Sequence, residues 1–191
     1  MKKGVLLFIL CLCLSCGSDP VPKPRAFLRL DYPQPQYKMI RPDLPFAFER
    51  NTLSEPIDTL RLSPDNATIG LELVYPSLKG TLFLTYKKIE KKNLQSFLSD
   101  AQNITQTHAR RADGISEQPF VDFEDRVFGA LFEVIGDAAS QSQFYATDST
   151  DHFLAGSLYF YARPNYDSIF PAAEYLKRDM QHLMETLKWK Q

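Results

Sequence analysis

The chain has 191 residues, with 22 basic and 23 acidic side chains and a formal net charge of −1 at pH 7. A chain without a basic excess has little with which to neutralise phosphates, so a nucleic-acid partner is not expected. Aromatic residues make up 13% of the chain, which fits a globular core rich in β-forming residues. The length suits one domain behind a short tether.

The first fifteen residues predict an export signal. Lys2 and Lys3 give a positive start, residues 5–14 (VLLFILCLCL) are apolar, and Ser15 precedes Cys16. The apolar run is too short for a transmembrane helix, which needs roughly 20 residues. A small residue directly before a cysteine indicates a lipoprotein signal, so Cys16 is the predicted lipidation site and the first mature residue. A plain secretory signal cut elsewhere and an uncleaved anchor are the alternatives.

All three cysteines, Cys11, Cys13 and Cys16, belong to this signal or its end. Cys13 stands three residues before Cys16, where lipoprotein signals usually carry Leu, and cysteine packs there as a small hydrophobe. The mature domain is therefore expected to have no disulfide and no thiol chemistry. Without Lys2 and Lys3, the mature chain has 20 basic and 23 acidic residues, a net charge of −3.

Residues 16–45 are expected to form a lipid-anchored, proline-rich tether and arm. Prolines at 20, 22 and 24 favour an extended spacer over residues 17–24, about 25 Å long at ~3.1 Å per residue. Aromatic residues such as Tyr32 and Tyr37 predict that residues 25–45 lie across the domain, because a disordered arm would carry fewer of them. A single domain is expected over residues 46–191.

Alternating apolar and polar residues predict a series of strands in that domain. The expected strands span residues 46–49, 57–62, 69–75, 81–86, 126–135, 143–146 and 152–161. The turn-forming segment 76–80 joins two of them, which predicts a hairpin. The segment 148–151 is also a turn by composition.

Two segments have the 3.6-residue period of an amphipathic helix. The first spans residues 93–112, with Asn93 as its expected cap and Gly114 just past its end. The second spans about residues 168–188, with Ser168 as its expected cap. Its apolar stripe consists of Ile169, Ala173, Leu176, Met180, Leu183 and Leu187. Runs of strands with few helices predict an α+β fold, an antiparallel sheet with packed helices.

An acid–histidine cluster is the first candidate for chemistry. Asp148, Asp151 and His152 could serve a hydrolase, but the same residue types favour a polar hairpin turn. His108 and His182 have no neighbours at metal-ligand spacing, so no metal site and no cofactor are expected.

Other candidate motifs are weaker still. Gly156-Ser157 is followed by Leu158-Tyr159, so it does not complete the G-x-S-x-G turn of serine hydrolases. Asp122 with Glu124-Asp125 could suit glycoside hydrolysis, although acidic pairs are common at turns. No constellation meets the criteria for catalytic roles, so an enzyme is not expected. A basic run could touch anionic headgroups or form a solvated helix entry; it consists of Lys87, Lys88, Lys91 and Lys92.

Three segments resemble one known family. They are CGSDPVPKPRAFLRLDYP from Cys16, QFYATDSTDHFLAGSLYF from Gln143, and PNYDSIFPAAEYLKRDMQHLMETLKW from Pro164. Together with Tyr37 and the segment 45–49, they resemble the gliding-motility-associated lipoprotein family GldD. The resemblance implies an envelope lipoprotein needed for gliding and for the associated type IX secretion machinery, and it brings no catalytic residues. The closing strands and helix also resemble the α+β sandwich of PsbP and Mog1 proteins, which is an analogy of fold alone.

These observations predict a non-enzymatic protein anchored at Cys16 to the outer membrane and facing the periplasm. Only Asp19 closely follows Cys16, so an acid-rich surface-export tag is not evident. Other gliding or secretion proteins of the envelope are the expected partners. Tyr32 and Tyr37 of the arm are candidate contacts, although packing against the core is the favoured interpretation of both residues. The alternative is a periplasmic module that binds a small ligand or lipid. A deep apolar cavity with converging polar groups would favour that alternative, and a closed core would remove it.

Overall fold

The computed structural model describes residues 30–40, 44–57, 60–62, 67–90, 93–109, 112–161 and 165–190. Cys16, the export signal and the spacer at residues 17–24 lie outside these ranges. The described strands are β1 (Tyr37–Ile40), β2 (Phe46–Asn51), β3 (Leu60–Leu62), β4 (Thr68–Tyr75), β5 (Gly80–Lys88), β6 (Ala112–Asp122), β7 (Val127–Gly136), β8 (Ser140–Thr147), β9 (His152–Phe160) and β10 (Lys188–Trp189). The helices are the 3₁₀ turn η1 (Pro76–Leu78), α2 (Leu94–Ala109) and α3 (Tyr166–Glu185).

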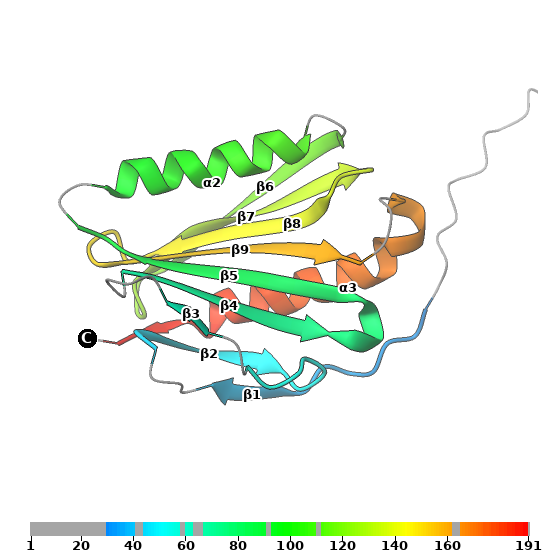
Figure 1. Ribbon diagram of the computed structural model, residues 1–191, viewed down its shortest axis with the longest axis horizontal. Coiled ribbons are helices and arrows are strands. Elements are labelled where there is room, and N and C mark those ends of the chain that lie inside the picture. Colours follow the sequence, from blue (N-terminus) through cyan, green and yellow to red (C-terminus); the bar gives the residue numbers. More distant parts are fainter. Residues whose placement is uncertain are drawn as a thin grey trace, which may run out of the picture.

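The strands form two antiparallel sheets, which confirms the α+β class. The larger sheet is seven-stranded in the order β3-β4-β5-β9-β8-β7-β6, and the smaller is three-stranded in the order β1-β2-β10. The two helices lie on opposite sides of the larger sheet (Figure 1). Adjacent residues of β7 confirm this, because neighbours in a strand point to opposite faces. Glu133 bonds Lys177 of α3, whereas Phe132 lines a recess with residues of α2.

The main hydrophobic core fills the space between the larger sheet, α3 and β2. All six apolar residues predicted on the last helix are buried: Ile169, Ala173, Leu176, Met180, Leu183 and Leu187. The last four of them belong to this core. The sheet contributes alternate residues of β4 and β5, and β2 contributes Phe46 and Phe48, both fully buried. The two larger cavities among the described residues lie outside this core, one between α2 and the sheet and one at the β8–β9 turn.

The predicted hairpin of β4 and β5 is confirmed. The two strands pair from Thr68↔Lys87 to Tyr75↔Gly80, and η1 makes the turn. Lys79 closes that turn in the left-handed conformation, with φ of 51°. Gly80 follows because a Cβ there would lie 2.9 Å from the Leu176 side chain of α3. Of the expected strand at 57–62, the structure gives β3, and residues 58–59 lie outside the described ranges.

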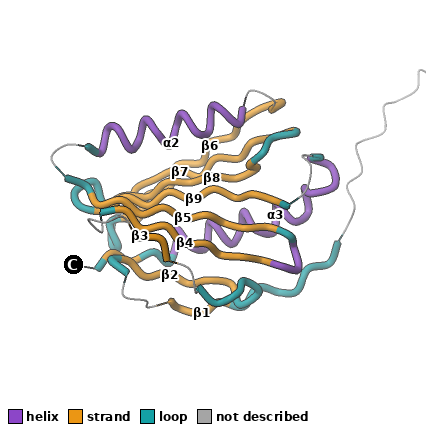
Figure 2. The backbone as a smooth tube through the Cα atoms, in the orientation of Figure 1, coloured by secondary structure: helices purple, strands orange, loops and turns teal. Residues whose placement is uncertain are grey.

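The edge strand β6 is absent from the sequence prediction. The expected helix at 93–112 ends at Ala109, and Ala112 already belongs to β6, so its assignment to the helix is wrong. No residue of β6 is buried and most are exposed. The strand pairs only with β7, at the edge of the sheet (Figure 2). A strand without a buried face shows little alternation in its sequence, and Pro119 within it also argues against a strand.

The ends of the last helix also differ from the prediction. The helix begins at Tyr166 with Asn165 at the N-cap position, and the hydroxyl of Ser168 donates to the Asn165 carbonyl. It ends at Glu185, three residues earlier than expected, because the chain then turns to pair with β2. Leu187 is nevertheless fully buried, since the turn carries it into the same core.

Part of the predicted arm is described, and it lies against the domain. Residues 37–40 form β1, which pairs with β2 in the smaller sheet. The ring of Tyr32 lies 5.2 Å from that of Tyr175 on α3, and the Tyr175 hydroxyl donates to the Pro33 carbonyl at 3.0 Å. The arm is therefore held along α3 by its aromatic residues.

Candidate functional site

Asp148 holds the β8–β9 turn together. Its Oδ1 accepts the backbone N–H groups of Thr150, Asp151 and His152 at 3.0, 2.9 and 2.8 Å, and its Oδ2 accepts the Thr150 hydroxyl at 2.7 Å. Burial alone would raise the pKa of Asp148, but these hydrogen bonds outweigh burial and lower it. The turn interpretation of this cluster is thus the one that the geometry supports.

His152 is paired with aromatic residues instead of a carboxylate. Its Nδ1 lies 2.9 Å from the Tyr86 hydroxyl, and its ring stacks on Trp189 at 5.2 Å with 5° between the planes. Burial, followed by the charges of Asp148 and Asp151, raises the pKa of Tyr86 to about 12, so the phenol stays neutral. The orienting carboxylate–imidazole pair of a hydrolytic triad is not formed here.

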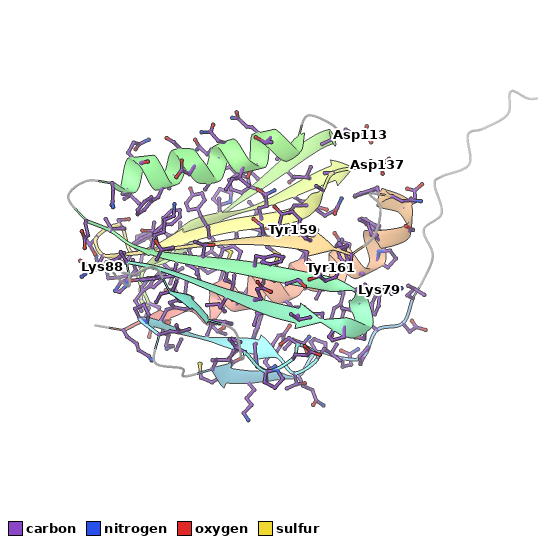
Figure 3. The ribbon with its side chains drawn as sticks, in the orientation of Figure 1. Lys79, Lys88, Asp113, Asp137, Tyr159 and Tyr161 are labelled. Atoms are coloured by element: carbon purple, nitrogen blue, oxygen red, sulfur yellow. The ribbon has the colours of Figure 1, made fainter. Side chains whose placement is uncertain are left out.

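Residues of this turn line a polar cavity of about 630 Å³ at one end of the larger sheet. Lys88, labelled in Figure 3, lies at that end of β5. The predicted acidic pair Glu124-Asp125 also lines the cavity, but Asp122 accepts both of its backbone N–H groups at 2.8 and 3.1 Å. The pair is therefore part of the β6–β7 turn, and Asp125 further pairs with Lys188 at 3.4 Å.

The predicted basic run is divided by the pleat of β5. Lys87 points to the α2 face, where it pairs with Asp100 at 3.5 Å and lies 4.6 Å from the centre of the Phe97 ring. Lys88 is exposed and lines the polar cavity instead. Lys91 and Lys92 lie outside the described residues. Lys87 and Lys88 thus do not form one basic patch.

An apolar groove of about 590 Å³ lies between α2 and the sheet, and we call it the α2 groove. Its floor consists of residues from β5 and β9, including Tyr159, which Figure 3 labels. Its wall consists of Phe97, Ala101 and Ile104 of α2 with neighbouring polar residues. The predicted stripe of this helix is only partly buried, and Ile104 is 45% exposed. Sequence periodicity located the stripe but could not show that the sheet leaves part of it uncovered.

Gly156 and Ser157 point to opposite faces of β9. The Phe144 ring packs over Gly156, where a Cβ would lie 2.2 Å from ring carbon Cε1. Glycine therefore serves close packing at this position, as in many strand interiors. Ser157 faces the α2 groove, whose described lining contains no histidine that could activate it.

Comparison with known proteins identifies the family. The family model described as "Gliding motility lipoprotein GldD" matches residues 17–189. The chain belongs to this family. No curated protein and no solved structure matches it, so the likeness to PsbP and Mog1 stays a prediction. Within the described residues of this GldD-family protein, no helix is long and apolar enough to span a bilayer.

The GldD chain also contains a buried polar network that sequence reasoning missed. Asp179 of α3 is 6% exposed and accepts hydrogen bonds from the Tyr37 hydroxyl at 2.8 Å and from Asn51 Nδ2 at 3.1 and 2.9 Å. Burial raises the pKa of Asp179, although these hydrogen bonds lower it in part. The available signal was an acidic residue at helical spacing among the buried residues of the last helix.

His182 belongs to the same attachment between α3 and the arm. Its Nε2 lies 2.8 Å from a Glu49 carboxylate oxygen, and its ring stacks on Tyr37 at 3.6 Å. Tyr37 therefore makes its side-chain contacts within the domain. The side chain of His108 lies outside the described part of α2. Among the described residues, no group of His, Cys, Asp and Glu is arranged to hold a metal ion.

Proposed function

We propose that this protein is a non-enzymatic lipoprotein of the cell envelope, accessory to gliding motility and to the associated type IX secretion machinery. The observation that carries the proposal is the family match over residues 17–189. It covers residues 46–189 of the domain and the predicted tether from residue 17 onward. The domain is then a scaffold that presents a surface to other envelope proteins.

The geometry of the candidate residues supports a role without catalysis. Asp148 is occupied by the backbone of its own turn, and Asp122 holds the Glu124-Asp125 turn. His152 bonds a phenol whose raised pKa keeps it neutral. Asp148, Asp122 and His152 thus have structural partners, and among the described residues of these sites none is arranged as a nucleophile with its base.

The membrane anchor is proposed to be a lipid on Cys16, with residues 16–45 as tether and arm and residues 46–191 as the domain. We place the protein on the periplasmic side of the outer membrane. The short apolar run before Cys16 and the small residue next to it support this anchor. The docked arm sets how far the domain can move from the membrane.

Replacement of the anchor tests the proposal. Cys16→Ser should move the protein from the membrane fraction to the soluble fraction of the envelope, while circular dichroism and the urea midpoint of the domain stay unchanged. Ser18→Ala, two residues away in the spacer, is the matched control and should remain membrane-bound. A Cys16→Ser protein that stays in the membrane fraction would show that lipidation is not the anchor.

A deletion strain tests the proposed role. The strain should lose gliding and the export of type IX substrates, and the wild-type gene should restore both. Crosslinking of the wild-type protein in intact cells, followed by mass spectrometry, should capture gliding or secretion proteins of the envelope. Normal gliding and normal secretion in the deletion strain would contradict the proposal.

A further inference from the structure

We propose that the α2 groove binds a single aliphatic chain that carries an uncharged oxygen group, such as the acyl chain and ester of a monoacylglycerol. The inference is independent of the proposed role in secretion. The argument rests on the shape of the groove, its apolar wall and a buried amide beside it.

The shape of the groove follows from side-chain sizes on its floor. The cross-strand pairs Thr85↔Ala155 and Phe83↔Ser157 place three small side chains in the middle. Larger rings close the ends: Phe83 packs edge-on against Tyr159 at 5.7 Å, and Phe97 lies 5.5 Å from Phe153. The floor from Phe153 to Tyr159 is roughly 20 Å long at ~3.3 Å per strand residue. A long, narrow trough suits an extended chain better than a compact ligand.

The wall of the groove is apolar and incompletely buried. Phe97 and Ala101 of α2 are half-buried, and Ile104 is 45% exposed. The helix contacts mainly β6, β7 and β8. Lys87 of β5 contacts Asp100 and the Phe97 ring on the other side, and Ile104 of α2 stays exposed. An aliphatic chain in the groove would remove apolar surface of both the helix and the sheet from water. The volume of about 590 Å³ lies within the usual range for small-molecule sites, roughly 300–1,000 Å³.

A buried amide beside the groove calls for a polar ligand group. Gln143 of β8 is 3% exposed, and its Oε1 accepts the Thr105 hydroxyl at 2.8 Å. Its Nε2 has no hydrogen-bond partner among the described residues. The amide lines a recess of about 20 Å³ that shares Ala101, Ile104, Ala155 and Ser157 with the α2 groove. A buried donor without an acceptor is unfavourable, so an oxygen atom placed here would be bound well.

The charges at the groove favour an uncharged ligand. Lys87 and Asp100 are the charged residues of its lining, and they pair with each other at 3.5 Å. Lys87 also lies over the Phe97 ring, so its ammonium is already engaged. An anionic headgroup would have to compete with Asp100. A monoacylglycerol instead offers an ester carbonyl as an acceptor and hydroxyls as donors, which matches either orientation of the Gln143 amide.

Dye binding to the full chain tests the site. The chain with Cys16→Ser, which removes the proposed lipid, permits measurements without detergent. The hydrocarbon dye diphenylhexatriene should bind saturably, and monopalmitoylglycerol should displace it. Ser157→Phe fills the middle of the trough and should weaken both ligands about tenfold or more, the effect of ~1.4 kcal/mol. Ser116→Phe makes the same change on exposed β6 and should leave binding unchanged.

A second variant tests the polar contact separately. Gln143→Leu removes the buried amide, so the variant should fold at least as well as the wild type. Its affinity for monopalmitoylglycerol should fall roughly 2- to 12-fold, as for one lost hydrogen bond, while diphenylhexatriene binding stays unchanged. Absence of saturable dye binding would overturn the proposal. So would displacement of the dye by an extended hydrophobic peptide but not by monopalmitoylglycerol.

Discussion

The pKa values of two buried acidic residues shift in opposite directions. Asp148 is surrounded by backbone N–H donors that outweigh burial, so its pKa is lowered. Asp179 lies deeper between α3 and β2, where burial outweighs the bonds from Tyr37 and Asn51, so its pKa is raised. The three backbone donors to Asp148 come from residues of its own turn. The donors to Asp179 come from distant segments of the chain. Asp148 therefore stabilises the fold in its charged form.

Replacement of Asp148 should measure that stabilisation. Asp148→Ala leaves several part-buried donors of the turn without this acceptor, so we expect a loss of about 1–3 kcal/mol in the free energy of unfolding. Asp151→Ala, on the same turn but exposed, is the matched control and should change it by less than about 0.5 kcal/mol. Urea denaturation at neutral pH gives both values. Equal effects of the two substitutions would contradict the structural role of Asp148.

The cost of Asp148→Ala should also depend on pH. A carboxyl whose pKa is lowered in the folded state stabilises the fold fully above its unfolded pKa, about 3.9. This contribution is lost as pH falls through the folded pKa. The difference between wild type and Asp148→Ala should therefore be largest near neutral pH and shrink in acid. Urea midpoints measured across that range check the sign, and a difference that grows in acid would refute it.

Helix α3 packs against both the larger sheet and β2 of the smaller sheet. One face packs in the core, and Asp179 and His182 bind the arm through Tyr37. The apolar face was predictable because its residues repeat at helical spacing within one segment. The residues that Tyr37 of the arm contacts were not predictable, because Tyr37 and Asp179 are 142 residues apart. Such a contact leaves no local pattern.

Loss of one hydrogen bond should loosen β1. Tyr37→Phe removes the donor to Asp179 but keeps the ring stacked on His182. Hydrogen exchange of the β1 amides should accelerate roughly 2- to 12-fold, as expected for ~0.5–1.5 kcal/mol. Tyr161→Phe makes the same change at an exposed residue after β9 and should leave β1 unaffected. Unchanged exchange in Tyr37→Phe would mean that stacking and strand pairing alone hold the arm.

At the scale of the whole molecule, the two faces of the larger sheet have different roles. The α3 face carries the main hydrophobic core, which includes the largest fully buried side chains. The α2 face is only partly covered and carries the α2 groove. A protein with this asymmetry can be stable through one face and still bind a ligand or partner through the other. We therefore expect functional substitutions to concentrate on α2 and on the exposed side of β5 and β9.

Gliding assays should show whether the β8–β9 turn has a hydrolytic role or whether functional residues lie on the α2 face. A strain that carries His152→Ala, at normal protein abundance, should glide and secrete like the wild type, because the ring stacks on Trp189 and bonds Tyr86 without a carboxylate. Immunoblotting checks abundance. Loss of gliding with His152→Ala alone, at normal abundance, would revive the hydrolase alternative.

Features that depend on local periodicity were predictable from the sequence alone. These are the α+β class, the central strands β4, β5, β7 and β9, and the buried stripe of α3; the segments that resemble GldD also led to the family that the comparison confirmed. Only the tertiary structure decided β1, β6 and β10, the Asp179 network and the α2 groove. An edge strand needs no alternation because neither face must be buried. A buried network and a groove depend on side chains from distant segments, so they exist only once those segments have packed.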